Sequence, residues 1–100
     1  MKNVLLIIFL VFASCTNRKE VYKNAEISCG QCQFNLEGEG CSLAVRYNNN
    51  AYYVEGFGID DFGDAHNKET GFCEVIRTGE ITGFVKDEKF IASNIILNKK

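Results

Sequence analysis

Cys29 and Cys32 are separated by two residues, and this spacing serves three different chemistries. Such a pair can supply two ligands of a zinc site, form a redox-active dithiol, or belong to a framework of structural disulfides. Two more cysteines, Cys41 and Cys73, and the single histidine, His66, follow along the chain. Thiolates with an imidazole suit zinc or a soft copper ion, so these five residues are candidate metal ligands.

The start of the chain predicts export and lipidation. A charged Lys2, the apolar run Val4–Val11 and small residues before a cut site are typical of a secretory signal peptide, and the run is too short to span a bilayer. Ala13-Ser14-Cys15 resembles the bacterial lipoprotein box, although Phe12 stands where that box prefers leucine. We therefore predict that Cys15 carries lipid and anchors the protein to a membrane of the bacterial cell envelope, facing the periplasm or the exterior.

This interpretation divides the chain into three parts. Residues 1–15 form the signal peptide that ends at the lipidated cysteine, residues 16–24 are a tether, and residues 25–98 form one small cysteine-containing domain. Cysteines outside the cytoplasm tend to be oxidised, and an even number in a small exported domain favours structural disulfides. Because bonds between distant segments stabilise most, we expect Cys73 to pair with Cys29 or Cys32.

Two alternatives to disulfides stay open. One is a zinc or copper site built from the cysteines, with or without His66. The other is a thiol–disulfide redox protein, in which a helix N-terminus usually lowers the thiol pKa. Here the Cys-x-x-Cys motif is expected to follow a strand and to precede the glycine-rich segment 37–40, so that activation is missing.

Alternating apolar residues and turn signals predict five strands. They are expected near residues 21–27, 43–47, 51–54, 81–85 and 90–97, with asparagines 48–50 and Asp87-Glu88 closing two hairpins and a bulge or bend at Gly83. The spacing of Phe72, Cys73 and Ile76 predicts a helix over 64–77, capped by Asp61 or Asp64. We therefore expect a mainly β, OB-like barrel with one helix between its third and fourth strands; a rolled α+β sheet is the alternative.

An antiparallel meander of the first three strands would bring the two cysteine-bearing stretches to the same end of the barrel. On a continuous helix, His66 and Cys73 would lie about 10.5 Å apart along the axis. Two ligands of one zinc ion cannot be that far apart, so His66 and Cys73 could share a site only if the helix broke at Gly71.

Composition excludes several functions. The formal net charge of −2 argues against nucleic-acid binding, which needs a basic face. The chain has a single histidine, no recognisable Ser-His-Asp signature and no phosphate-binding glycine loop. We therefore expect a protein that is not an enzyme.

Four short motifs resemble those of a family of small exported bacterial proteins of unknown function. They are Cys29-Gly-Gln-Cys32, Gly40-Cys-Ser-Leu-Ala-Val45, Gly63-Asp-Ala-His66 and Gly71-Phe-Cys73. The resemblance covers about residues 25–96. It implies the limits of the domain and no established activity.

Overall fold

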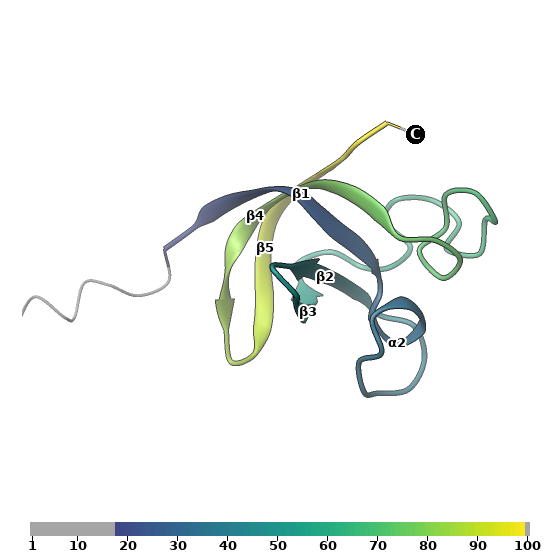
Figure 1. Ribbon diagram of the computed structural model, residues 1–100, viewed down its shortest axis with the longest axis horizontal. Helices are drawn as coiled ribbons and strands as arrows, with labels where there is room; N and C mark the ends of the chain where they lie inside the picture. The colour runs from purple at the N-terminus through teal and green to yellow at the C-terminus, as the bar shows by residue number, and fades with distance from the viewer. Residues whose placement is uncertain (1–17, 100) are drawn as a thin grey trace, which may run out of the picture.

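The computed structural model describes residues 18–99, so the predicted signal peptide and Cys15 lie outside the described residues. Five strands close into one barrel: β1 (Glu20–Cys29), β2 (Leu43–Tyr47), β3 (Asn50–Glu55), β4 (Arg77–Lys86) and β5 (Lys89–Leu97) (Figure 1). Neighbouring strands follow the order β1-β2-β3-β5-β4, and β3 and β5 pair in parallel. The predicted mainly β, five-stranded barrel is confirmed.

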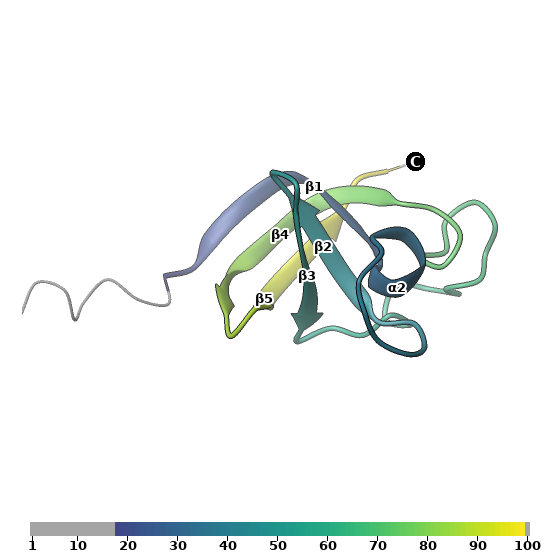
Figure 2. The same cartoon turned by 60° about the horizontal axis from the view of Figure 1, so that its bottom comes forward.

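The two tight hairpins form where the sequence predicts them. Asn48 and Asn49, between β2 and β3, have φ of 53° and 68°, and Asp87 and Glu88, between β4 and β5, have φ of 52° and 65°. Two consecutive residues with positive φ match the right-handed twist of the flanking strands. Both hairpins lie on the side of the barrel away from α2, the β4–β5 hairpin near the start of β1 and the β2–β3 hairpin beside the middle of β1 (Figure 2).

The core is formed by inward-facing apolar side chains of the strands and by residues from the connections between them, of which Phe34, Ala65 and Phe72 are buried. Ile27, Val45 and Ile81 are almost fully buried at its centre. Phe72, which belongs to the connection between β3 and β4, is 2% exposed and packs in the same cluster. The long connection is therefore held against the barrel by a core contact.

The helix predicted over 64–77 is wrong, because the connection over residues 56–76 consists of turns. Asp64 and Asn67 accept hydrogen bonds from backbone amides two or three residues ahead, and such local bonds compete with a helix. The helix present is α2 (Gly30–Gln33), a single turn directly after β1. Among the described residues, no helix has the length and apolarity needed to cross a membrane.

Gly83 interrupts the pairing of β4 with β5, as its position in the sequence predicts. The register shifts between Thr82 and Gly83, and Gly83 has φ of 159°. A β-carbon at this position would collide with the carbonyl oxygen of Ile91. The bulge therefore depends on the missing side chain.

We expect Gly83→Ala to lower the free energy of unfolding by more than the cost of backbone strain alone, which is about 1–3 kcal/mol. Gly63→Ala is the matched control, because Gly63 also has a positive φ of 115° but has nothing within 4 Å of its added β-carbon. Urea unfolding of both variants measures the difference. Equal losses of stability would show that the close approach to Ile91 is unimportant.

Candidate metal centre

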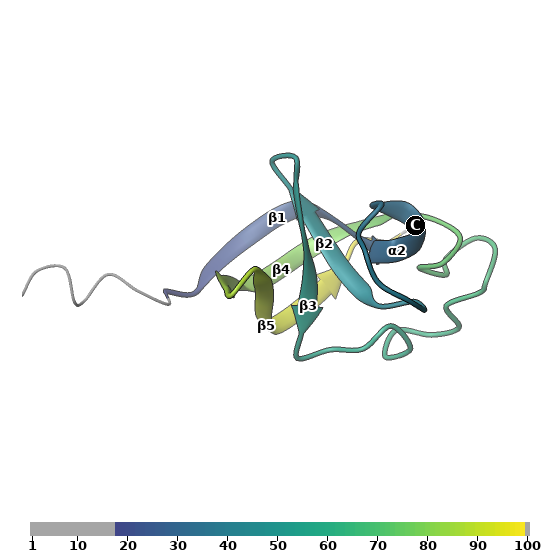
Figure 3. The same ribbon diagram turned by 90° about the horizontal axis from the view of Figure 1, so that it is seen from below.

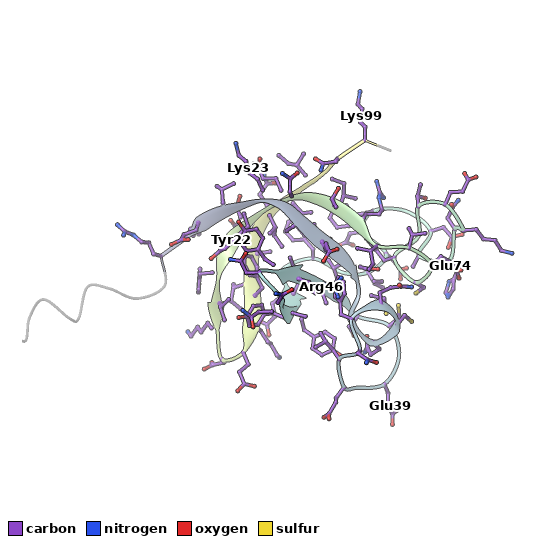
Figure 4. All side chains as sticks on the ribbon, viewed as in Figure 1. Tyr22, Lys23, Glu39, Arg46, Glu74 and Lys99 are labelled. Carbon is purple, nitrogen blue, oxygen red and sulfur yellow. The ribbon has the colours of Figure 1, made fainter. Side chains whose placement is uncertain are left out.

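Four cysteines meet beside α2, at the barrel end opposite the two hairpins. The Sγ atoms of Cys29, Cys32, Cys41 and Cys73 all lie within 4.8 Å of one another. In Figure 4 the yellow sulfur atoms gather between α2 and the connection that carries Glu74. The predicted convergence of the two cysteine-bearing stretches at one end of the barrel is therefore confirmed.

The end of β1 and the turn of α2 position the first two thiols. Cys29 is the last residue of β1 and is fully buried, and it caps α2. Its Sγ accepts a hydrogen bond from the backbone amide of Cys32 at 3.4 Å. Gly30 allows this turn to lie close to β3, because a β-carbon there would come within 2.8 Å of the Tyr53 ring.

Gln31, between the first two cysteines, fixes the segment that carries the third. Its Oε1 accepts a hydrogen bond from the amide of Ser42 at 2.8 Å, and its Nε2 donates to the carbonyl of Glu39 at 3.1 Å. The amide of Gly30 donates to the carbonyl of Ser42 at 2.8 Å. These bonds hold Cys41 over the turn of α2.

Cys73 is carried to the cluster by bonds between β1 and the long connection. The amide of Cys29 donates to the carbonyl of Phe72 at 3.1 Å. The buried hydroxyl of Ser28 lies 2.6 Å from the same carbonyl oxygen and 2.7 Å from that of Val75. On the other side, Gln33 Nε2 donates to the carbonyl of Cys73 at 3.1 Å. Figure 3 shows this connection folded back beside α2.

His66 does not join the cluster. It is exposed, and its backbone amide donates to Asp64 Oδ1 at 2.9 Å in a tight local turn. Within residues 18–99, the group of metal-ligating side chains that converges consists of the four cysteines. The candidate site therefore has a purely sulfur ligand set.

The pKa values of Cys29, Cys32 and Cys41 are shifted in different directions, and the four thiols differ in access to solvent. Burial opposes ionisation of Cys29, but hydrogen bonds from the Cys41 side chain and the Cys32 amide outweigh it and lower its pKa. The hydrogen bond with Cys29 raises the pKa of Cys32, which is exposed. Burial, followed by hydrogen bonds with Cys29 and Cys73, raises the pKa of Cys41. The thiol with the lowered pKa, Cys29, is thus a buried one.

The disulfide expected between Cys73 and Cys29 or Cys32 is not present: all four cysteines are free thiols in the structure. Each disulfide places two sulfur atoms at about 2.05 Å, so a disulfide framework would divide the four cysteines into two bonded pairs. Tetrahedral zinc, with Zn–S bonds of about 2.3 Å, places four sulfur atoms about 3.8 Å from one another. Four mutually close thiols fit a common ion better than a pair of bonds.

Comparison of the sequence with known protein families gives one match, over residues 23–98. The chain belongs to DUF6370, a family of unknown function. The region that matches DUF6370 contains the whole barrel from β1 residue Lys23 onward and all four clustered cysteines. No curated protein and no solved structure matches the chain. The chemistry of this DUF6370 member must therefore be argued from its own residues.

Ser28 and Gln31 were not singled out by the sequence as contributors to this site. A serine before and a glutamine inside a Cys-x-x-Cys motif have no spacing signal of their own, because their partners lie up to 47 residues away. The only indication available in the sequence was their position beside the motif.

Replacing Ser28 with alanine tests the junction between β1 and the connection. We expect a loss of about 0.5–1.5 kcal/mol in the free energy of unfolding, because a buried hydrogen bond is removed while the amide of Cys29 still donates to the carbonyl of Phe72. Ser93→Ala is the control. The exposed Ser93 hydroxyl makes a long hydrogen bond of 3.4 Å to the carbonyl of Thr82 and lies away from the cysteines. Thermal unfolding of both variants measures the effect. If both variants melt alike, the Ser28 junction does not hold the site.

Proposed function

We propose that this DUF6370 member is a zinc-binding, lipid-anchored domain of the cell envelope, in which Cys29, Cys32, Cys41 and Cys73 together hold one zinc ion. The observation that carries the proposal is the convergence of four Sγ atoms within 4.8 Å. A four-sulfur tetrahedral set is typical of zinc or of iron–sulfur centres. Copper(I), which thiolates also favour, is the other metal that the sequence suggested.

A set of four protein ligands supports a structural role. Catalytic zinc sites keep one position open for water or substrate, whereas structural sites are closed by four protein ligands. The four cysteines come from β1, α2 and two connections that lack regular secondary structure. An ion bound to all of them would cross-link these segments at one end of the barrel, so we propose a protein that is not an enzyme.

The redox alternative fits the thiols less well. α2 does supply the helical turn that the sequence did not predict, but it has only four residues. The thiol with the lowered pKa is Cys29, which is fully buried, while the exposed Cys32 has a raised pKa. A thiol–disulfide enzyme needs the opposite arrangement, with an accessible thiolate as its nucleophile.

Metal analysis of the purified full chain tests the zinc proposal. We expect one zinc per chain by mass spectrometry of the elements, and cobalt substitution should give the intense thiolate-to-metal absorption of a four-sulfur site. Cys41→Ser removes a proposed zinc ligand. It should therefore lower the affinity for zinc by more than the roughly 10–100-fold that is typical when a residue hydrogen-bonded to a ligand is lost. Cys15→Ser is the matched control and should keep its metal.

Three outcomes contradict the proposal in distinguishable ways. Copper or iron in place of zinc would keep the site but change the metal. Two disulfides in the intact mass of the folded protein, with no metal, would restore the framework that the sequence favoured. A Cys29–Cys32 bond that opens and closes with a reductant would restore the redox alternative.

The anchor proposal rests on the Ala13-Ser14-Cys15 sequence after an apolar run of signal length. We expect Cys15→Ser to leave the protein unprocessed or to release it from membranes, because the lipid can no longer be attached. Sedimentation of membranes and the mass of the mature chain measure both effects. A Cys15→Ser protein that is cleaved and still sediments with membranes would contradict lipidation.

A further inference from the structure

The barrel end opposite the cysteines has an unusual surface. It is formed by the start of β1, the β2–β3 hairpin and the β4–β5 hairpin, and we call it the hairpin end (Figures 1 and 2). Three exposed apolar side chains lie there: Val21 at 53%, Val85 at 44% and Tyr47 at 36% of full exposure. Tyr47 and Val85 line the opening of the barrel, and Val21 lies beside it near the start of β1.

A shallow hollow opens beside Tyr47 and Val85, which form part of its lining. Its volume is about 150 Å³, and the buried side chains of Val45 and Ile81 form part of its lining. The ring of Tyr22 packs edge to face against the rings of Tyr47 and Phe90, with distances between ring centres of 5.0 Å and 5.5 Å. Tyrosines with an apolar body and a polar tip are enriched where protein meets the membrane–water interface.

The chain also enters the barrel at this end. The described residues begin at Arg18, two residues before β1, and the candidate lipid site Cys15 precedes Arg18 by three. An extended chain spans at most about 3.6 Å per residue, so residues 16–19 reach no more than about 15 Å. A lipid on Cys15 would therefore keep the hairpin end close to the bilayer.

We propose that the hairpin end is a docking face for a phospholipid bilayer, against which Val21, Tyr47 and Val85 rest. This inference rests on the lipid anchor proposed above and adds the orientation of the domain. Because β1 already begins at Glu20, the tether is shorter than the predicted residues 16–24 and consists of residues 16–19. This short tether keeps the local concentration of bilayer high, so a small apolar face suffices for contact.

Charge gives this face little preference for anionic lipid. The basic residues Arg18, Lys19, Lys23 and Lys86 are accompanied by the acidic residues Glu20, Asp87 and Glu88 in the same two segments, so the net charge there is small. Lys89 is paired with Glu55 at 3.1 Å. The contact is therefore apolar and aromatic, and zwitterionic phosphatidylcholine is a sufficient probe.

The orientation has a consequence for the cysteines. β1 runs from the hairpin end to Cys29 over ten residues, which corresponds to about 33 Å of extended strand. The cysteine cluster would thus point away from the bilayer, into the aqueous compartment, with the exposed Cys32 outermost.

A single tryptophan tests the orientation, because the natural chain has none. Val85→Trp and Ile76→Trp are matched variants of full-length lipidated protein: both positions are exposed apolar residues, at 44% and 37%, and Ile76 lies at the cysteine end. Each variant is reconstituted into phosphatidylcholine vesicles brominated near the headgroup end of the acyl chains. We expect bromine to reduce the emission of Val85→Trp at least twofold and to leave Ile76→Trp unchanged. Tyr47→Trp is a second probe if Val85→Trp misfolds.

The outcomes separate this inference from the anchor. If the protein floats with vesicles but the hairpin-end probes are quenched no more than Ile76→Trp, the docking face is refuted and the anchor stands. If the protein does not float with vesicles, the anchor is refuted and the docking face with it. The cobalt-substituted forms of Val85→Trp and Ile76→Trp are also compared. Equal thiolate-to-cobalt absorption shows that neither substitution disturbs the cysteine end.

Discussion

The structure depends on the junction between the end of β1 and the long connection that follows β3. There the amide of Cys29 and the hydroxyl of Ser28 meet the carbonyl of Phe72, while the Phe72 ring is buried in the barrel core. The core contact fixes the position of residue 72, and the backbone bonds fix its direction. Cys73, the next residue, therefore reaches the other three thiols without belonging to a helix or a strand.

The two ends of the barrel are built by different means. At the hairpin end, two-residue turns with positive φ join neighbouring strands, and such turns need no further support. At the cysteine end, residues 34–42 and 56–76 connect strands without regular secondary structure. Ordering such segments costs conformational entropy, and cross-linking them at one point offsets part of that cost. The cysteines lie at the end where a cross-link has most to stabilise.

Strands could be predicted because their signals are local: alternation of apolar residues, and asparagines that accept positive φ. The predicted helix failed for a physical reason. The spacing of Phe72 and Ile76 looked helical, but Phe72 is buried by the barrel and Gly71 packs against the backbone of Ala65, where a β-carbon would not fit. Conversely, α2 is one turn long and has no period to detect. That the cysteines meet followed from chain direction, whereas the roles of Ser28 and Gln31 require coordinates.

Export and free thiols are in tension, because cysteines outside the cytoplasm tend to oxidise. Four thiols this close would be expected to form bonds with one another in such a compartment. The proposed ion would resolve the tension, since sulfur atoms that coordinate a metal no longer carry a free thiolate for oxidation. It would also explain why a thiol with a lowered pKa is buried: Cys29 would act as a ligand inside the protein, not as a nucleophile at its surface. The zinc site and the exported location are therefore linked proposals, because without the ion the same four residues would make the disulfide framework that their number first suggested.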